Sequence, residues 1–265
     1  MDGEILCVPL EYDTVWLECT SNTSEFGVLG PSTENRNALL LTEDGGKLVP
    51  TPGSKPENYR TNIVTTIKLV GDGGGITETI FRANGRQRDA FEHFLTETRD
   101  KQKEYFVQNL GFKQPDDFEF KKKEVSGIHT TELRMAIEKI PEFVAGSKMF
   151  LSPRIYKFYT ARLPRSENRQ LDYHFPNPFE KMDTTIFQLP EGFTIDALPE
   201  GKELKCAYAQ YNTKYWFDEQ KKAIYSTARL VLNQHRIPAA EYAEVKKFFD
   251  NILLDDGQRI VIRKL

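Results

Sequence analysis

This 265-residue chain contains more than ten short runs of β-branched and aromatic residues, separated by turns rich in glycine, proline and acidic residues. Helix-length amphipathic segments do not alternate with these runs, so the repeating β-α pattern of a parallel sheet is missing. Clear helices are predicted near residues 96–110 and 239–252, and residues 86–94 are a candidate N-terminal extension of the first. We therefore expect a mainly β fold with a minor α+β character: antiparallel sheets, sandwich-like, with two or three covering helices.

The sharpest break in the pattern is the segment PTPGSKP at residues 50–56. Three prolines and a glycine within seven residues exclude a regular helix or a central strand. We therefore place a linker at residues 50–57. It divides a short N-terminal module, residues 1–49, from a β-rich domain, residues 58–265.

Inside the β-rich domain, residues 62–70 and 76–83 flank a glycine-rich turn and predict a hairpin. A phosphate-binding loop would need a helix after the glycines, whereas threonines and isoleucines favour a strand there. Residues 131–140 fit a strand or a helix equally well. Further strands are expected at residues 155–163 and, as an antiparallel meander, over the last third of the chain.

Charge and composition exclude several classes of protein. The net charge is −3, from 36 basic and 39 acidic residues that are interleaved, so no basic stripe for nucleic acid is present. No run approaches the ~20 apolar residues of a membrane-spanning helix, and no signal peptide is visible.

Metal and cofactor sites are not expected either. Three cysteines lie far apart without CxxC spacing, and four histidines are scattered without helical or hairpin pairing. No phosphate loop or hydrolase motif is present.

One cluster of aromatic residues is a candidate binding site: Tyr208, Tyr211, Tyr215 and Trp216, on two adjoining predicted strands. Such a cluster can form a platform for a peptide or glycan. Cross-strand packing within a large sheet is the competing interpretation, and we favour it.

The segment Trp16–Thr20, WLECT, resembles the W-x-D-x-T strand of transglutaminase-like, papain-type proteins. Residues 35–48 (NRNALLLTEDGGKL), 189–193 (LPEGF), Leu198-Pro199 and 237–242 extend the resemblance to bacterial envelope proteins that carry a transglutaminase-like core between two β-rich domains of uncharacterised function. The resemblance implies a periplasmic or extracellular location. It also implies that residues 1–49 are the last strands of such a core, here incomplete, and that the following residues form the adjoining β-rich domain.

In that family a cysteine nucleophile is activated by a histidine, and an acid orients the imidazole. Glu18 falls at the position of the acid, although it is one methylene longer than the family's aspartate. The family's histidine would lie near Gly3, but no histidine precedes His93. The nucleophile would lie before residue 1, and Cys7 and Cys19 do not replace it.

The resemblance and the missing residues lead to three functional hypotheses. The leading one is a non-catalytic accessory or binding region that holds a peptide or glycan. The second is a part of a peptidase or acyltransferase whose cysteine and histidine lie upstream or on another chain. The third is a purely structural module. Residues 1–49 are expected to dock on the β domain or to mediate self-association, because strands cut from a larger core expose apolar edges. An upstream transglutaminase-like core is a further possible partner.

Overall fold

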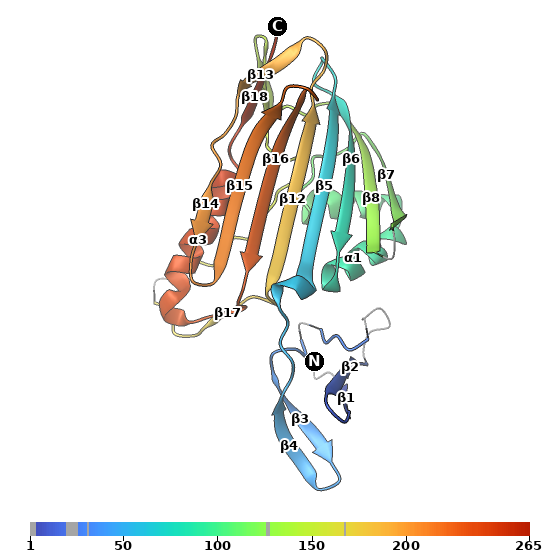
Figure 1. The fold of residues 1–265 in the computed structure, drawn as a ribbon, viewed down its shortest axis with the longest axis vertical. Helices are drawn as coiled ribbons and strands as arrows, with labels where there is room; N and C mark the ends of the chain where they lie inside the picture. The colour runs from blue at the N-terminus through green and yellow to red at the C-terminus, as the bar shows by residue number, and fades with distance from the viewer. Residues whose placement is uncertain (1–3, 20–25, 31, 126–127, 167) are drawn as a thin grey trace.

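The computed structural model describes residues 4–19, 26–30, 32–125, 128–166 and 168–265. It shows an N-terminal region of two small hairpins and a large β domain, joined through residues 50–59 (Figure 1). The hairpins are antiparallel pairs of β1 (Ile5–Pro9) with β2 (Thr14–Glu18) and of β3 (Asn37–Thr42) with β4 (Gly45–Pro50). A short 3-10 turn, η1 (Pro56–Tyr59), leads into the domain.

The β domain is built on one eight-stranded sheet in the order β14-β15-β16-β12-β5-β6-β8-β7. Its strands are β5 (Arg60–Leu69), β6 (Gly75–Ala83), β7 (Asp117–Val125), β8 (Ile128–Ile137), β12 (Phe179–Gln188), β14 (Glu203–Lys205), β15 (Ala209–Asp218) and β16 (Ala223–Leu232). All neighbours are antiparallel except β5 and β12, which pair in parallel at the centre. The sheet therefore consists of two antiparallel halves that meet at one parallel pair.

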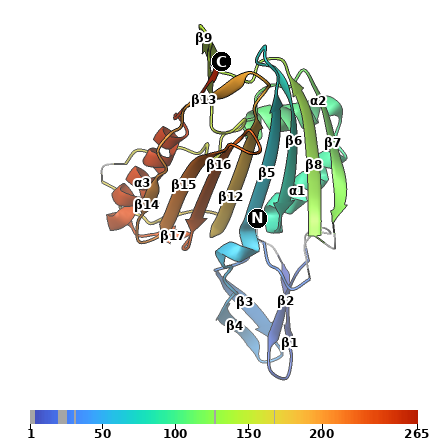
Figure 2. The same cartoon turned by 45° about the horizontal axis from the view of Figure 1, so that its top comes forward.

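Helices and irregular chain cover one face of this sheet, which we call the inner face. The helices are α1 (Gly85–Leu95), α2 (Arg99–Glu104), the π-helical turn η2 (Tyr105–Asn109), the 3-10 turn η3 (Ala239–Glu241) and α3 (Tyr242–Asp255). Helices α1 and α2 lie behind the β6–β8 half, and α3 lies beside β14 and β15 (Figures 1 and 2). Contacts fix both placements: the rings of Phe81 on β6 and Phe91 on α1 are 4.7 Å apart, and Tyr211 on β15 donates a 2.8 Å hydrogen bond to Asp255 of α3.

A second, four-stranded sheet closes one end of the domain. It has the order β13-β18-β10-β9, from β9 (Phe143–Ala145), β10 (Lys148–Leu151), β13 (Phe193–Ala197) and β18 (Ile260–Lys264). A two-residue pair, β11 (Tyr173–His174) with β17 (Arg236–Ile237), lies near the start of α3. Together these elements bury one continuous core on the inner face.

The expected mainly β fold with a few covering helices is confirmed. Residues 131–140 fit two structures. Residues 131–137 belong to the strand β8, because alternate side chains such as Leu133 and Met135 are fully buried on the inner face, and residues 138–140 lie beyond its end. The predicted helix at 96–110 is two shorter pieces, α2 and η2, and a separate helix, α1, precedes them.

Two predictions are wrong. Residues 155–163 form no strand: the segment is flanked by Pro153 and Pro164, and its side chains are buried at Ile155, Tyr156, Phe158 and Tyr159 without period-two alternation. It fills the layer over the inner face instead of joining a sheet. The last third is also not a simple meander, because β13 leaves the large sheet and β12 pairs in parallel with β5.

Candidate functional site

A cavity of about 390 Å³ opens on the inner face, where β5 and β12 pair in parallel; we call it the Lys181 cavity. Strands β5 and β12, the turns η1 and η2, helix α1 and the segment before β12 all contribute to its wall. The residues are Tyr59, Thr61, Asn84, Ala90, Tyr105, Asn109, Leu110, Pro176, Asn177, Phe179 and Lys181. Segments distant in the sequence therefore meet at this one place, as is usual for ligand sites.

Strand alternation decides that Lys181 belongs to the inner face. On β12, Asp183 and Phe187 are buried on that face, and Lys181 lies at the same parity two residues before Asp183. In the parallel pair, Lys181 is level with Thr61 of β5, which also lines the cavity. Glu180 has the opposite parity and is held by Arg60 and Arg229 on the outer face, at 2.7 Å each.

The π-helical turn η2 shapes the opposite wall of the cavity. The Leu110 amide donates to the Tyr105 carbonyl at 3.1 Å, the i to i+5 bond of a π-helix, and this widened turn supplies Tyr105, Asn109 and Leu110 to the lining. Single π-helical turns occur frequently at functional sites. Gly111 follows with φ of +69°, in the left-handed conformation that ends a helix.

Lys181 is half-buried and, unlike the buried charges of the domain, has no partner among the described residues. Within the described part of the chain its ammonium takes part in no ion pair or hydrogen bond, and burial alone lowers the pKa of Lys181. Neighbouring Asp183, also on β12, is instead bound by Arg154 at 3.1 Å and by the Tyr156 hydroxyl at 2.9 Å. Because an unpaired, partly desolvated ammonium is costly, the cavity is electrostatically suited to an anion.

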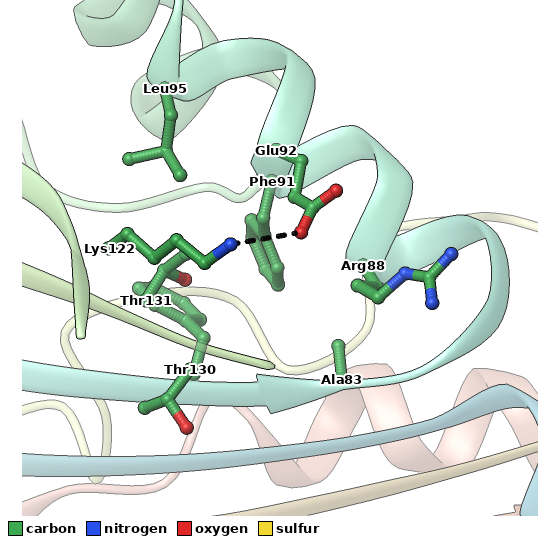
Figure 3. A pocket seen from close by; sticks show the side chains of 9 residues that line it. Ala83, Arg88, Phe91, Glu92, Leu95, Lys122, Thr130 and Thr131 are labelled. Carbon is green, nitrogen blue, oxygen red and sulfur yellow. Dashed lines mark ion pairs between the residues drawn. The ribbon is translucent and has the colours of Figure 1, made fainter. Parts of the chain in front are cut away.

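A second hollow lies between α1, β6 and β8 and is much smaller (Figure 3). Its volume of about 10 Å³ is enough for one water molecule. Lys122 and Glu92 face each other across its mouth at 3.8 Å, and the buried Thr131 hydroxyl has no hydrogen-bond partner within the protein. This hollow therefore suits a bound water better than a ligand.

The four aromatic residues singled out in the sequence lie on different surfaces. Tyr208 and Tyr211 are buried, with 8% and 1% of their surface exposed, and Tyr215 shares the parity of Tyr211 on the inner face. Trp216 points to the outer face, where it stacks on Tyr225 of β16 with ring centroids 4.9 Å apart. The structure thus leaves Trp216, together with Tyr225, as the aromatic pair that is accessible to a partner.

Glu18 lies at the end of β2, in the N-terminal region. Its Oε2 accepts a 2.9 Å hydrogen bond from the Thr33 hydroxyl, and Thr33 in turn accepts one from the Gly30 amide at 3.1 Å. The carboxylate is thus oriented by the loop that follows the hairpin. The free thiols Cys7 and Cys19 lie on the same hairpin and just after it.

The histidines with described side chains all lie in the β domain. His93, on α1, lies 3.4 Å from Glu97, and the rings of His174 and His235 are 6.0 Å apart beside the β11–β17 pair. The side chain of His129 lies outside the described residues. Among the residues that the structure describes, no group of three or more histidine, cysteine or acidic side chains could hold a metal ion, and no helix is long and apolar enough to cross a membrane.

Sequence reasoning missed Lys181 and Tyr225 for different reasons. Tyr225 could have been found, because counting back from the turn at residues 219–222 places it opposite Trp216 in the hairpin. Within the expected meander the strand pattern is clear only from residue 184, whereas β12 starts at Phe179 and so includes Lys181. Even with the correct start, its importance depends on what covers the inner face.

Comparison with known proteins gives a partial family match. Residues 147–262, from β10 to β18, match the family model DUF3858, described as a domain of unknown function with a solved structure. Lys181 lies inside this match, whereas Thr61 and Asn109 lie before it. No curated protein matches the chain.

Among solved structures, the chain is similar to a crystal structure described as a "putative protease" from Parabacteroides distasonis. The sequence identity is 13% and the TM-score 0.32. The match covers 38% of this chain and 19% of that chain.

Proposed function

We propose that this chain is a non-catalytic binding region whose β domain takes up a ligand in the Lys181 cavity. One observation carries the proposal: an ammonium group that has no partner in the described part of the chain lines a space of about 390 Å³, next to amide and hydroxyl side chains. Unpaired buried charge is costly and is concentrated at functional sites. A purely structural domain has no need of it, since an apolar side chain would fill the same position at lower cost.

A fragment screen by two-dimensional NMR tests this proposal. Acidic, basic and neutral compounds are added to the full chain, and shifted amide resonances are mapped onto β5, β12 and η2. We expect shifts at Thr61, Asn109 and Lys181 with compounds of at least one class. If no class of compound shifts these resonances, the cavity is not a binding site, and the result favours the hypothesis of a purely structural module.

We further propose that residues 1–49 dock on a transglutaminase-like core, as the resemblance implies, with residues 50–57 as the linker and the periplasm or cell exterior as the location. The support is apolar exposure: Leu39, Leu41 and Leu48 of the second hairpin are 64%, 79% and 66% exposed. In the first hairpin, Leu6 and Leu10 are also 57% and 55% exposed. Exposed leucines so numerous on two short hairpins are typical of a surface that a partner covers.

Light scattering and amide exchange test the docking role. A monomer with fast exchange in β3 and β4 is expected for the isolated chain, because these leucines are mostly exposed in the part of the chain that the structure describes. Protection should appear when a transglutaminase-like core is added. Strong protection in the monomer alone would contradict this, since it would mean that the leucines are already buried in solution.

Catalysis completed by another polypeptide is the second candidate, and the geometry of Glu18 favours it. The Thr33 hydroxyl holds the carboxylate in one orientation, as an acid that positions an imidazole must be held. Mixing with a core that carries cysteine and histidine should then give amidase or acyl-transfer activity, which Glu18→Gln removes and Glu11→Gln, on the exposed turn, preserves. The non-catalytic proposal predicts no stimulation, and activity traced by alkylation to Cys7 or Cys19 would contradict it.

A further inference from the structure

The Lys181 cavity continues into a narrower apolar pocket, and the two together define the ligand. The pocket has a volume of about 60 Å³ and shares Thr61, Asn109, Leu110 and Lys181 with the cavity. Its remaining wall is largely apolar and includes Phe91, Phe112 and Phe158. Lys181 therefore lies where a wide space with several amide and hydroxyl side chains in its wall meets a narrow one walled largely by aromatic rings.

We infer that the ligand is a monocarboxylate with a short apolar tail, its carboxylate on Lys181 and its tail in the apolar pocket. This inference rests on the proposed binding function and names the chemistry of the ligand. The two spaces match the two ends of such a molecule. Either end alone would leave the ammonium unpaired or the apolar pocket unfilled.

The charge of the lining favours one negative group. The described residues that line the two spaces include no aspartate, glutamate or arginine, and their cations are Lys181 and, at the apolar pocket, the exposed Lys157. An ammonium without a nearby acid gains a charge-assisted hydrogen bond from a ligand carboxylate. A phosphate is a weaker fit, because dianionic groups are usually held by guanidinium forks or several backbone amides.

The neutral polar groups fit the polar side of such a molecule. Asn177 uses its Nδ2 to donate to the Pro178 carbonyl at 2.7 Å, which leaves its carbonyl oxygen as an acceptor at the cavity. Asn109 and Thr61 add further amide and hydroxyl groups. A carboxylate with an apolar tail is found in a short fatty acid and in the C-terminal residue of a peptide, where the tail is an apolar side chain. The experiment distinguishes these two sources.

Calorimetric titration of the full chain with matched probes tests the inference. Hexanoate is compared with hexanamide and hexylamine for charge, with acetate and butyrate for tail length, and with N-acetyl-leucine as a mimic of a peptide C-terminus. Hexanoate or N-acetyl-leucine should bind at least tenfold more tightly than its amide, and affinity should rise from acetate to hexanoate. The tighter of the two identifies the source of the ligand.

Two variants assign the effect to the site. Lys181→Met should weaken carboxylate binding at least tenfold, whereas Lys68→Met, on the outer face of β5, should leave it within twofold. If hexanoate and hexanamide bind with equal affinity, or if hexanoate binds Lys181→Met as tightly as the wild type, the inferred carboxylate contact is wrong. If acetate and hexanoate bind with equal affinity, the inferred contact of the apolar tail is wrong. If neutral or basic fragments still shift the cavity resonances, the binding function stands and only its ligand class is wrong.

Discussion

The N-terminal region and the β domain use the same strand pattern, yet only one of them has a core. In the β domain, Leu133 and Phe187 are fully buried under helices and irregular chain. In the N-terminal region, Leu39 and Leu41 alternate just as regularly but remain mostly exposed, because none of the described segments forms a second layer over the hairpins. Two-stranded hairpins are marginal on their own in water. Alternation thus specifies strands, and burial depends on a second layer.

Removing a buried charge should give the largest difference in the free energy of unfolding between the two regions. Arg154 is 1% exposed and is bound to Asp183 and to Asp256, at 3.1 and 3.0 Å. Arg154→Ala leaves both carboxylates without this partner and should lower the free energy of unfolding by about 3–5 kcal/mol, measured by urea denaturation. The control Arg36→Ala, at an exposed site of the N-terminal region, should cost about 0.5 kcal/mol or less. Equal losses would mean that the N-terminal region is as tightly built as the domain.

The same substitution at two leucines sharpens the comparison. Leu133→Ala truncates a fully buried side chain and should lower the free energy of unfolding by about 2–5 kcal/mol. Leu41→Ala changes a side chain that is 79% exposed and should stay within about 0.5 kcal/mol. A loss above 1 kcal/mol for Leu41→Ala, growing with protein concentration, would show that the hairpin is buried by self-association.

Lys181 is an exception among the charged residues of the β domain, because its removal should stabilise the folded protein. Lys181→Met eliminates an unpaired, partly buried ammonium and is expected to raise the free energy of unfolding by about 1 kcal/mol at pH 7. Because burial lowers the pKa of Lys181, the unfolded chain binds this proton more tightly than the folded one. Wild-type stability should therefore rise as pH increases through the interval below 10.5, and the advantage of the variant should shrink there.

The exposed Lys47→Met in β4 serves as the matched control for that measurement. Its thermal midpoint should equal that of the wild type at neutral and at alkaline pH. If Lys181→Met is destabilising instead, the lysine is making a stabilising contact in solution, and the binding proposal loses its main support.

The smallest expected effect concerns the module boundary. A chain that begins at residue 50 should melt within about 4 °C of the full chain, since a change of 1 kcal/mol or less is expected. The lost contacts include the hydrogen bond from Ser54 to the buried Glu34 and the main-chain pairing of Thr51 with Arg36. A much lower melting temperature would show that the N-terminal region is part of the folding unit.

Much of the local structure could be predicted because it depends on neighbouring residues. The β5–β6 hairpin follows from two β-branched runs around Gly73, whose φ of +97° favours glycine. Helix α3 follows from the apolar stripe that includes Val245, Phe249 and Ile252, all buried as expected. In these elements the spacing of side chains already determines which face is buried.

The candidate site could not be predicted, because its parts are far apart in the chain. Glu18 and the aromatic cluster were visible as local motifs, and their functional roles remain predictions. The Lys181 cavity requires that residue 181 lie beside residue 61 and under residue 109, and no local pattern encodes that arrangement.

By itself, the sequence determined a mainly β chain, its principal hairpins and its last helix, whereas the linker at residues 50–57 stays a prediction. Only the tertiary structure decided the parallel pairing of β5 with β12, the irregular course of residues 155–163 and the isolation of the Lys181 ammonium. The physical reason is range. Turns and alternation act over a few residues, whereas the burial of a charge depends on every segment that packs against it.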